Sequence, residues 1–300
     1  MKILLLGKDG QVGQELQRTL LPLGETLALG RSGADLSDLS TLRATLQAHN
    51  PDIIVNAAAY TAVDKAESEP QAAAQINTIA VSALAQHAKA TDALLVHYST
   101  DYVFNGAGDT PYLETNPTDP QSVYGTTKRD GEAAILDSGC NALIFRTSWV
   151  FSSRGGNFLK TILRLAATKD SLNVVADQFG APTSAELIAD VTALAINAFR
   201  QDRLQAGIYH LTASGVVSWC EFARYIVNQA TAQGIALTLT ANQVHAIPAA
   251  DYPTPAKRPQ NSRLDNSKLS SALRLQMPHW TAHASRAIDQ LKRLGNPNNA

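Results

Sequence analysis

The sequence predicts an α/β protein built on a Rossmann-type doubly wound parallel sheet, with a smaller region toward its C-terminal end. Short apolar runs that are typical of buried parallel strands alternate with longer helical patterns through the first half of the chain. A glycine-rich turn joins the first apolar run to the first helical pattern, and polar residues follow several later runs. We expect a sheet core over residues 1–149 and a second region over 150–300, some segments of which return to the core.

Each element of the core can be placed from its own pattern. We expect strands at residues 2–6, 25–29, 52–55, 94–98 and 142–145. We expect helices at about residues 11–21, 39–49, 70–90 and 124–140. Because strands and helices alternate, the strands should run parallel, with helices on both faces of the sheet.

The composition excludes several kinds of partner. The 300 residues carry a net charge of −1, from 25 basic and 26 acidic side chains, so neither nucleic acid nor an anionic membrane is indicated. The two cysteines, Cys140 and Cys220, make no disulfide framework or metal-binding motif. The apolar run near the N-terminus is too short for a signal peptide or a membrane span. We therefore expect a cytoplasmic protein.

The first turn carries Gly7, Gly10 and Gly13 in a G-x-x-G-x-x-G spacing. Glycines at such a turn let backbone N–H groups approach a pyrophosphate at the positive end of the next helix. Between a first strand and an amphipathic helix this turn predicts nucleotide binding, although a purely structural strand–helix turn is the alternative.

The residues after the second strand bear on which dinucleotide binds. NAD-binding units usually place Asp or Glu there, on the ribose 2′-hydroxyl. This chain has Gly30 and Arg31 instead, so no carboxylate at the strand tip repels a 2′-phosphate and an arginine can pair with it. The pattern favours NADPH, with NADH as a possible second cofactor, unless Arg31 is only a solvated loop residue. Asp35 and Leu36 are expected near the adenine.

Candidate catalytic residues follow the fourth strand and open the next helix. Ser99, Thr100 and Asp101 stand at the carboxyl end of a strand, where doubly wound sheets bind ligands. Tyr124 and Lys128 are four apart and share one helix face. A neighbouring ammonium lowers a phenol pKa from about 10 toward neutrality and makes the tyrosine a proton donor. The plainer alternatives are a helix cap and an ordinary surface helix.

The second half is expected to enclose a substrate as a smaller cap. Its patterns place helices at about residues 157–167, 185–199 and 219–229, and a strand at 207–211. A proline-rich run then leads to Arg258 and Arg263, which can meet the phosphates of a nucleotide-linked substrate or be surface charges.

Taken together, these motifs resemble the extended short-chain dehydrogenase/reductases. The glycine turn, Ser99–Asp101 and Tyr124–Lys128 have the spacing of that family. The resemblance covers nearly the whole chain, and its most specific stretches are residues 56–67, 99–104, 145–150 and 258–265. These stretches resemble the subgroup that uses NAD(P)H to reduce the 4-keto group of dTDP-4-dehydro-β-L-rhamnose, giving dTDP-β-L-rhamnose.

The resemblance implies a role for each site residue. Tyr124 would donate the proton, Lys128 would hold the nicotinamide ribose and lower the tyrosine pKa, and Thr100 would bind the reacting oxygen. With the residues placed above, the cofactor set is Gly7, Gly10, Gln11, Val12, Gly13, Arg31, Asp35, Leu36, Ala59, Tyr60 and Thr61, with Tyr124 and Lys128. The substrate set is Val63, Thr100, Asp101, Tyr102, Trp149 and Arg258.

Tyr102 separates reduction from dehydration. Sugar-nucleotide 4,6-dehydratases of the same superfamily typically have Glu at this place, as part of the acid–base pair that eliminates water. A tyrosine there favours simple reduction. Two other readings stay open: an epimerase or 4-reductase acting on another dTDP-hexose, and a non-catalytic NADP-binding regulatory subunit. The complete set of Thr100, Tyr124 and Lys128 counts against the regulatory subunit.

A metal site is implied less directly. Some relatives form homodimers around Mg²⁺ held by carboxylates, and Glu15, Glu186 and Asp190 are present here. Glu186 and Asp190 are four apart, so on a helix they can offer oxygens to a hard cation from one face. The alternative is two solvated carboxylates.

Overall fold

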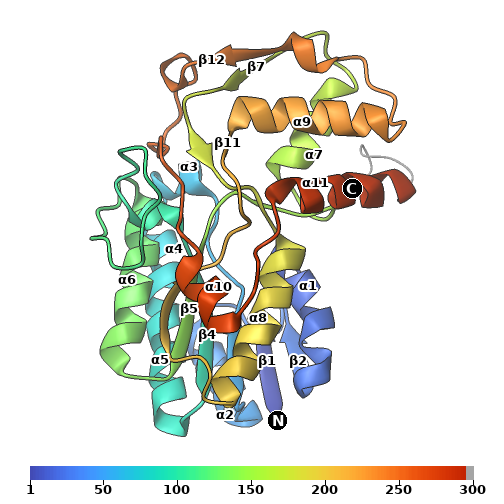
Figure 1. Ribbon diagram of the computed structural model, residues 1–300. Helices are drawn as coiled ribbons and strands as arrows, with labels where there is room; N and C mark the ends of the chain where they lie inside the picture. Colours follow the sequence, from blue (N-terminus) through green and yellow to red (C-terminus); the bar gives the residue numbers. More distant parts are fainter. Residues whose placement is uncertain (295–300) are drawn as a thin grey trace.

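The computed structural model describes residues 1–294, and its centre is a six-stranded sheet (Figure 1). The strands are Lys2–Leu6 (β1), Glu25–Leu29 (β2), Ile53–Asn56 (β3), Leu94–Thr100 (β4), Ala142–Thr147 (β5) and Gly207–His210 (β10). They lie in the order β10-β5-β4-β3-β1-β2, and every neighbouring pair is parallel. The predicted doubly wound parallel sheet is confirmed.

Helices cover both faces of this sheet. One face is covered by α2 (Leu39–His49), α5 (Ala80–Thr91) and α6 (Val123–Ser138), and the other by α1 (Gln11–Thr19) and α8 (Ala185–Arg200). Within β1, Leu4 and Leu6 pack under α2, α5 and α6, while Ile3 and Leu5 pack on the opposite face, under α1 and α8. Successive side chains of a strand point to opposite faces, so a strand buried on both faces is apolar throughout.

The helix expected at residues 70–90 is broken in the middle. It consists of α4 (Pro70–Ala74), a π-helical turn η2 (Gln75–Ile79) and α5. At this turn the Asn77 side chain accepts a hydrogen bond from Tyr60 N–H (2.9 Å) and donates one to the Tyr60 carbonyl (3.1 Å). The Asn77 carbonyl also packs so closely on Gly131 that a Cβ there would lie 2.2 Å from it. The widened turn coincides with these tertiary contacts, which cannot be predicted from local helix propensity.

The second half of the chain adds a layer beyond the carboxyl ends of the strands, at the top of Figure 1. Its helices are α7 (Phe158–Ala166), α9 (Trp219–Ala232) and α11 (Trp280–Arg293). Its paired short strands are β7 (Leu172–Val175) with β12 (Val244–Ile247), β8 (Phe179–Gly180) with β11 (Val217–Ser218), and β6 (Val150–Phe151) with β9 (Thr183–Ser184). Phe222 and Trp280 pack edge to face here, with ring centroids 5.4 Å apart.

Two segments of the second half are part of the sheet and its covering helices. Helix α8 packs along α1, and β10 extends the sheet beside β5. The short elements that remain are η1 (Leu21–Leu23), α3 (Val63–Ala66), η3 (Asp101–Val103), η4 (Ala241–Gln243), η5 (Ala249–Asp251) and α10 (Ser267–Leu273). Among residues 1–294, no helix has the length and apolar character needed to span a membrane.

Candidate active site

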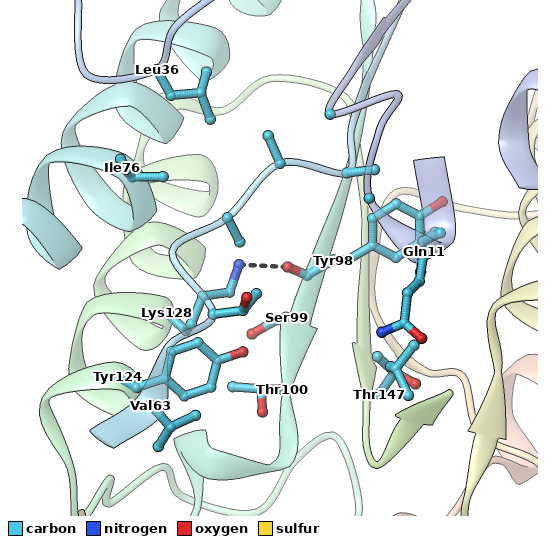
Figure 2. A pocket seen from close by; sticks show the side chains of 18 of the residues that line it. Gln11, Leu36, Val63, Ile76, Tyr98, Ser99, Thr100, Tyr124, Lys128 and Thr147 are labelled. Atoms are coloured by element: carbon cyan, nitrogen blue, oxygen red, sulfur yellow. Dashed lines mark hydrogen bonds between the residues drawn. The ribbon is translucent and has the colours of Figure 1, made fainter. Parts of the chain in front are cut away.

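A cavity of about 620 Å³ opens at the carboxyl ends of the sheet strands (Figure 2). Its walls come from the β1–α1 turn, the ends of β2 to β5, the π-helical turn and the first turns of α6. The chain reverses its order in the sheet between β1 and β3, and ligands of open α/β sheets bind at such a switch point. The cavity therefore lies where the fold class places a dinucleotide.

The glycine turn forms one end of this cavity. Gly7 has φ of +83°, which a side chain would strain, and a Cβ on Gly13 would lie 2.0 Å from the Gly7 carbonyl oxygen. Gly10 is the N-cap of α1 and provides no capping side chain, so the first N–H groups of that helix face the cavity mouth without a side-chain acceptor. These features fit a pyrophosphate. Gly13 itself does not line the cavity and acts by letting α1 pack close.

The predicted cofactor residues fall into two groups. Gly7, Gly10, Gln11, Val12, Arg31, Asp35, Leu36, Ala59 and Thr61 line the cavity. Tyr60 does not: its hydroxyl donates to Glu69 Oε2 at 2.8 Å, and its backbone is held by Asn77. The structure thus turns the Tyr60 ring away from the cavity.

The tip of β2 differs from expectation. A Cβ placed on Gly30 would lie 2.0 Å from Asp9 Oδ2, so the Asp9 carboxylate occupies the space that a strand-tip side chain would fill. Lys8 pairs with the same carboxylate at 2.6 Å. The expectation that no carboxylate lies at this strand tip is wrong, because the glycine turn supplies one from an adjacent loop. Asp9, Gly30 and Arg31 all line the cavity.

Thr100 and Tyr124 lie side by side in the lining of the cavity (Figure 2). Thr100 ends β4, and Tyr124 lies in the first turn of α6, which the side chain of Ser122 caps by accepting from Gly125 N–H at 3.1 Å. Burial raises the pKa of Tyr124 above its ordinary value, and the Thr100 hydroxyl beside it opposes the shift. The Tyr102 ring packs edge to face on Tyr124, with centroids 5.5 Å apart.

Lys128 lines the cavity as expected, but its amine is bonded to the backbone of β4. Its Nζ donates to the Tyr98 carbonyl at 2.6 Å, the dashed line in Figure 2, and lies 3.1 Å from His97 Nε2. Burial lowers the pKa of Lys128 to about 8, against an opposing effect of Glu132. The expectation that this lysine brings the Tyr124 pKa toward neutrality is wrong for the protein as it stands. Desolvation dominates both groups, and the lysine is directed toward β4.

Asp101 is a buried carboxyl group beside these residues. It is 3% exposed; its Oδ1 accepts from Thr100 Oγ1 at 3.0 Å. Within residues 1–294 its Oδ2 has no hydrogen-bond partner. Burial raises the pKa of Asp101 to about 6, although the nearby Ser262 and Thr100 hydroxyls oppose the shift. An acceptor of this kind fits a hydroxyl group of a ligand.

Of the other predicted substrate residues, some line the cavity and one does not. Val63, Tyr102 and Trp149 line the cavity with Thr100 and Asp101. Trp149 has φ of +51° and stacks on Trp219, with ring centroids 3.5 Å apart. Such a backbone conformation is unfavourable for a bulky residue and persists where tertiary packing enforces it.

Arg258 does not line the main cavity. Its Nη2 donates to Asp64 Oδ2 at 2.6 Å, and its Nη1 lies 3.4 Å from the Tyr102 hydroxyl. The half-buried guanidinium therefore stands behind Tyr102 and ties the proline-rich run to α3. Arg263 is likewise engaged, with its guanidinium 4.7 Å from the centre of the Phe179 ring.

The carboxylates proposed for Mg²⁺ are paired with cations or amides. Glu186 accepts from Arg286 at 2.8 Å and from Gln290 at 2.7 Å, while Asp190 pairs with Arg18 at 2.9 Å. Burial and the nearby Glu186 raise the pKa of Glu15. Across residues 1–294, no group of three His, Cys, Asp or Glu side chains is arranged to hold a metal ion. The structure does not support the metal prediction.

Sequence reasoning left several cavity residues out of the site, although Ser99, which it did consider, lines the cavity. Thr147 ends β5 and Ser148 follows it, so the rule that ligands bind at carboxyl ends could have found both. Ile76 enters through the π-helical turn, and Tyr98 enters from the middle of a buried strand, so neither had a sequence signal. His97 was also missed, although it contacts Lys128 directly.

The sheet, the glycine turn and the Thr–Tyr–Lys set together define a nicotinamide-dependent oxidoreductase site of the short-chain dehydrogenase/reductase class. The chain belongs to the RmlD substrate binding domain family, whose profile matches residues 1–293.

Individual relatives agree with this assignment. The chain is 49% identical to dTDP-4-dehydrorhamnose reductase of Escherichia coli (strain K12), over 97% of this chain and 98% of the relative. It is 47% identical to the Burkholderia thailandensis enzyme of the same name, over 93% and 95% of the two chains. The Bacillus anthracis enzyme in complex with NADP has a TM-score of 0.86 and 32% identity, over 96% of this chain and 99% of that one. A Thermus thermophilus UDP-glucose 4-epimerase shares the fold, with a TM-score of 0.80 at 17% identity.

Proposed function

We propose that this protein reduces the 4-keto group of dTDP-4-dehydro-β-L-rhamnose to give dTDP-β-L-rhamnose, the last step of dTDP-L-rhamnose synthesis, with NADPH as hydride donor. The observation that carries the proposal is the meeting of Thr100 and Tyr124 in the cavity that also contains the glycine turn. The names of relatives that match nearly the whole chain supply the substrate.

The chain's own residues provide the proton and the binding. When bound, the cofactor supplies the hydride that reduces the carbonyl carbon. Tyr124 gives its phenolic proton to the oxygen that becomes negative, and the neighbouring Thr100 hydroxyl hydrogen-bonds that oxygen. Because burial raises the Tyr124 pKa, the phenol is protonated in the resting protein, as a proton donor must be. Asp101 accepts from a sugar hydroxyl through its unpartnered oxygen.

Tyr102 supports reduction over dehydration in the structure as well. Its ring packs against Tyr124, and its hydroxyl faces Arg258, so its place contains no second carboxylate to remove a proton from the sugar ring. Burial raises the pKa of Tyr102 to about 12, so the phenol stays neutral and is a poor base.

The residues at the β2 tip support use of both NADPH and NADH. Arg31 and Lys8 are cations that can pair with a 2′-phosphate. Asp9 is an acceptor for a 2′-hydroxyl at the position of a strand-tip carboxylate. We also expect a homodimer; the Glu186 and Asp190 carboxylates are already paired with Arg286 and Arg18 of the same chain.

The direct test mixes the purified protein with dTDP-4-dehydro-β-L-rhamnose and NADPH. The absorbance of the reduced cofactor should fall, and NMR of the product should show the rhamno configuration at C4. Turnover of other dTDP-4-keto sugars but not this one would overturn the substrate assignment. Interconversion of C4 epimers without net cofactor oxidation would indicate an epimerase, and cofactor binding without any turnover would indicate the regulatory subunit.

A further inference from the structure

One residue of the cavity wall, Trp149, has a backbone that its residue type rarely adopts. It lines the cavity just after the end of β5, and its φ of +51° lies in the left-handed region. The other non-glycine residues of 1–294 with positive φ all follow helices, where this conformation is common; they are Asn50, Asp92, Asp202 and Arg274. A strained residue at a ligand site persists only where its surroundings enforce the strain.

One segment of the second half, residues 179–184, holds the backbone around Trp149. Thr183 N–H donates to the Trp149 carbonyl at 3.2 Å, and Val150 then pairs with Thr183 in β6–β9. At its other end the same segment forms β8, whose Gly180 lies opposite Val217 of β11. Since α9 begins directly after β11, the segment brings Trp149 beside the first residue of that helix, Trp219.

The indole of Trp149 is covered on both faces. On one face it stacks on Trp219, with ring centroids 3.5 Å apart and an interplanar angle of 11°. A Cβ built on Gly180 would lie 2.7 Å from Cε2 and 3.1 Å from Cδ2 of Trp149, the two atoms shared by its fused rings. A point that close to both fusion atoms lies over the plane of the indole, so Gly180 covers the other face. Only the edge of the indole is left to face the cavity.

Trp219 is itself fixed from behind. Its neighbour Ser218 caps α9 in a capping box, accepting from Glu221 N–H at 3.1 Å while the Glu221 carboxylate accepts from Ser218 N–H at 3.0 Å. Phe158, the first residue of α7, packs on the Trp219 ring with centroids 4.5 Å apart. Among the described residues that line the cavity, Trp219 is not included, so any effect it has on a ligand passes through Trp149.

We propose that Trp219 and Gly180 are positioning residues for the sugar substrate. They form a slot that holds the indole of Trp149 edge-on in the cavity wall and keeps its backbone left-handed. The role in substrate binding rests on the function proposed above, whereas the slot itself does not.

The plainer alternative is that the stack only stabilises the fold. A purely structural stack would lower the stability of the whole protein when broken, and the folded fraction would keep its affinity for every ligand. A slot that positions Trp149 has a selective effect, because the glycine turn that fits the cofactor pyrophosphate lies in another part of the cavity wall.

The first test compares two replacements of Trp219. Trp219→Ala removes the support and should raise KM for dTDP-4-dehydro-β-L-rhamnose roughly three- to tenfold, the worth of one aromatic pair, with kcat and the Kd of NADPH nearly unchanged. Trp219→Phe keeps an aromatic face and should restore most of the affinity. Trp280→Phe is the matched control, because Trp280 is a buried tryptophan of the same layer that packs on Phe222 and Tyr225. An unchanged KM in folded Trp219→Ala, or an equal rise in Trp280→Phe, would overturn the proposal.

The second test observes the slot without substrate. The chain has three tryptophans, so protein labelled with ¹⁵N-tryptophan gives three indole N–H signals that single replacements assign. Rings that overlap as fully as Trp149 and Trp219 shield each other's protons. The Trp149 signal should therefore move downfield in Trp219→Ala, move less in Trp219→Phe and stay in place in Trp280→Phe. A Trp149 signal that does not respond to Trp219→Ala would contradict the slot.

Gly180→Ala approaches the indole from its other face. The added methyl group would lie 2.7 Å from Trp149 Cε2, so the ring must shift, and KM for the sugar should rise as in Trp219→Ala. Once Trp219→Ala has freed the opposite face, the indole can move away from the methyl group. The double variant should therefore bind the sugar no more weakly than Trp219→Ala alone, whereas additive losses would show that the two residues do not act on one ring. If Trp219→Ala does not fold, Gly180→Ala and Trp219→Phe decide the question by KM and by the Trp149 signal.

Failure of this proposal is distinguishable from failure of the proposed function. A protein that reduces no dTDP-sugar but shows the expected indole shifts would refute the function and leave the slot in place. A protein that reduces the sugar normally, with the same KM in folded Trp219→Ala, would keep the function and refute the positioning role.

Discussion

Replacing Asp101 by Asn should make the protein more stable and less active. The Asp101 carboxyl group is 3% exposed, and one of its oxygens has no hydrogen-bond partner within the described chain. Burial raises its pKa from 3.8 to about 6. Between those values the folded protein binds more protons than the unfolded chain, so the free energy of unfolding falls as pH rises through this window.

The size of the effect follows from the shift. A rise of roughly two pKa units corresponds to about 3 kcal/mol, which is an upper limit for the stability gained by removing the charge. Asn keeps an oxygen that accepts from Thr100 Oγ1 and places an amide where the unpartnered oxygen lies, so packing is conserved. The gain should be full above about pH 7 and vanish below about pH 4, where wild-type Asp101 is protonated as well.

The assay is urea unfolding of the cofactor-free protein, followed by fluorescence of the three tryptophans at several pH values. Asp109→Asn removes the same charge from an exposed loop and controls for net charge. A difference between wild type and Asp101→Asn that does not change with pH would refute the reasoning, as would a less stable variant at neutral pH. If the stabilised variant also loses substrate affinity, the Asp101 carboxylate binds a substrate hydroxyl, and that function explains why it is kept although its burial lowers stability.

Three further predictions concern the cofactor and the proton. Tyr124→Phe should lower kcat by about 10²-fold or more in a reductase assay while leaving NADPH affinity nearly unchanged, and normal turnover would exclude Tyr124 as the donor. Arg31→Ala should weaken the binding of NADPH more than that of NADH, and Asp9→Asn should weaken the binding of NADH more than that of NADPH, both measured by calorimetry. Equal effects on both cofactors would show that these residues do not contact the 2′-position. Gly13→Ala should abolish binding of either cofactor, since its methyl group would lie 2.0 Å from the Gly7 carbonyl oxygen; wild-type affinity would show that α1 can shift.

The sheet could be predicted because its signals are local. A strand buried on both faces needs consecutive apolar residues, as in Leu4, Leu5 and Leu6, and the helix periods between strands impose the parallel order. Thr100 could be placed for a similar reason, since carboxyl ends of parallel strands meet at one edge, and Tyr124 could be identified from its four-residue spacing to Lys128. The π-helical turn could not, because its tertiary contacts come from Tyr60 and Gly131.

Side-chain direction within the site was harder to predict. Arg258 was expected in the substrate site but pairs with Asp64, which lies 194 positions away in the chain. Tyr60 stands in the expected segment, yet its hydroxyl is bonded to Glu69. Asp9 was not considered, although its carboxylate reaches the tip of a neighbouring strand. Each outcome depends on partners that only the folded chain brings together.

The sequence by itself determined the fold class, the glycine turn and the residue types of a nicotinamide-dependent reductase. Only the tertiary structure decided their chemical state. Lys128 and Tyr124 share a helix face in either view, but the burial that shifts both pKa values and the direction of the lysine toward the Tyr98 carbonyl come only from the folded chain. Desolvation and hydrogen-bond direction are properties of assembled surroundings, so no spacing along the chain encodes them.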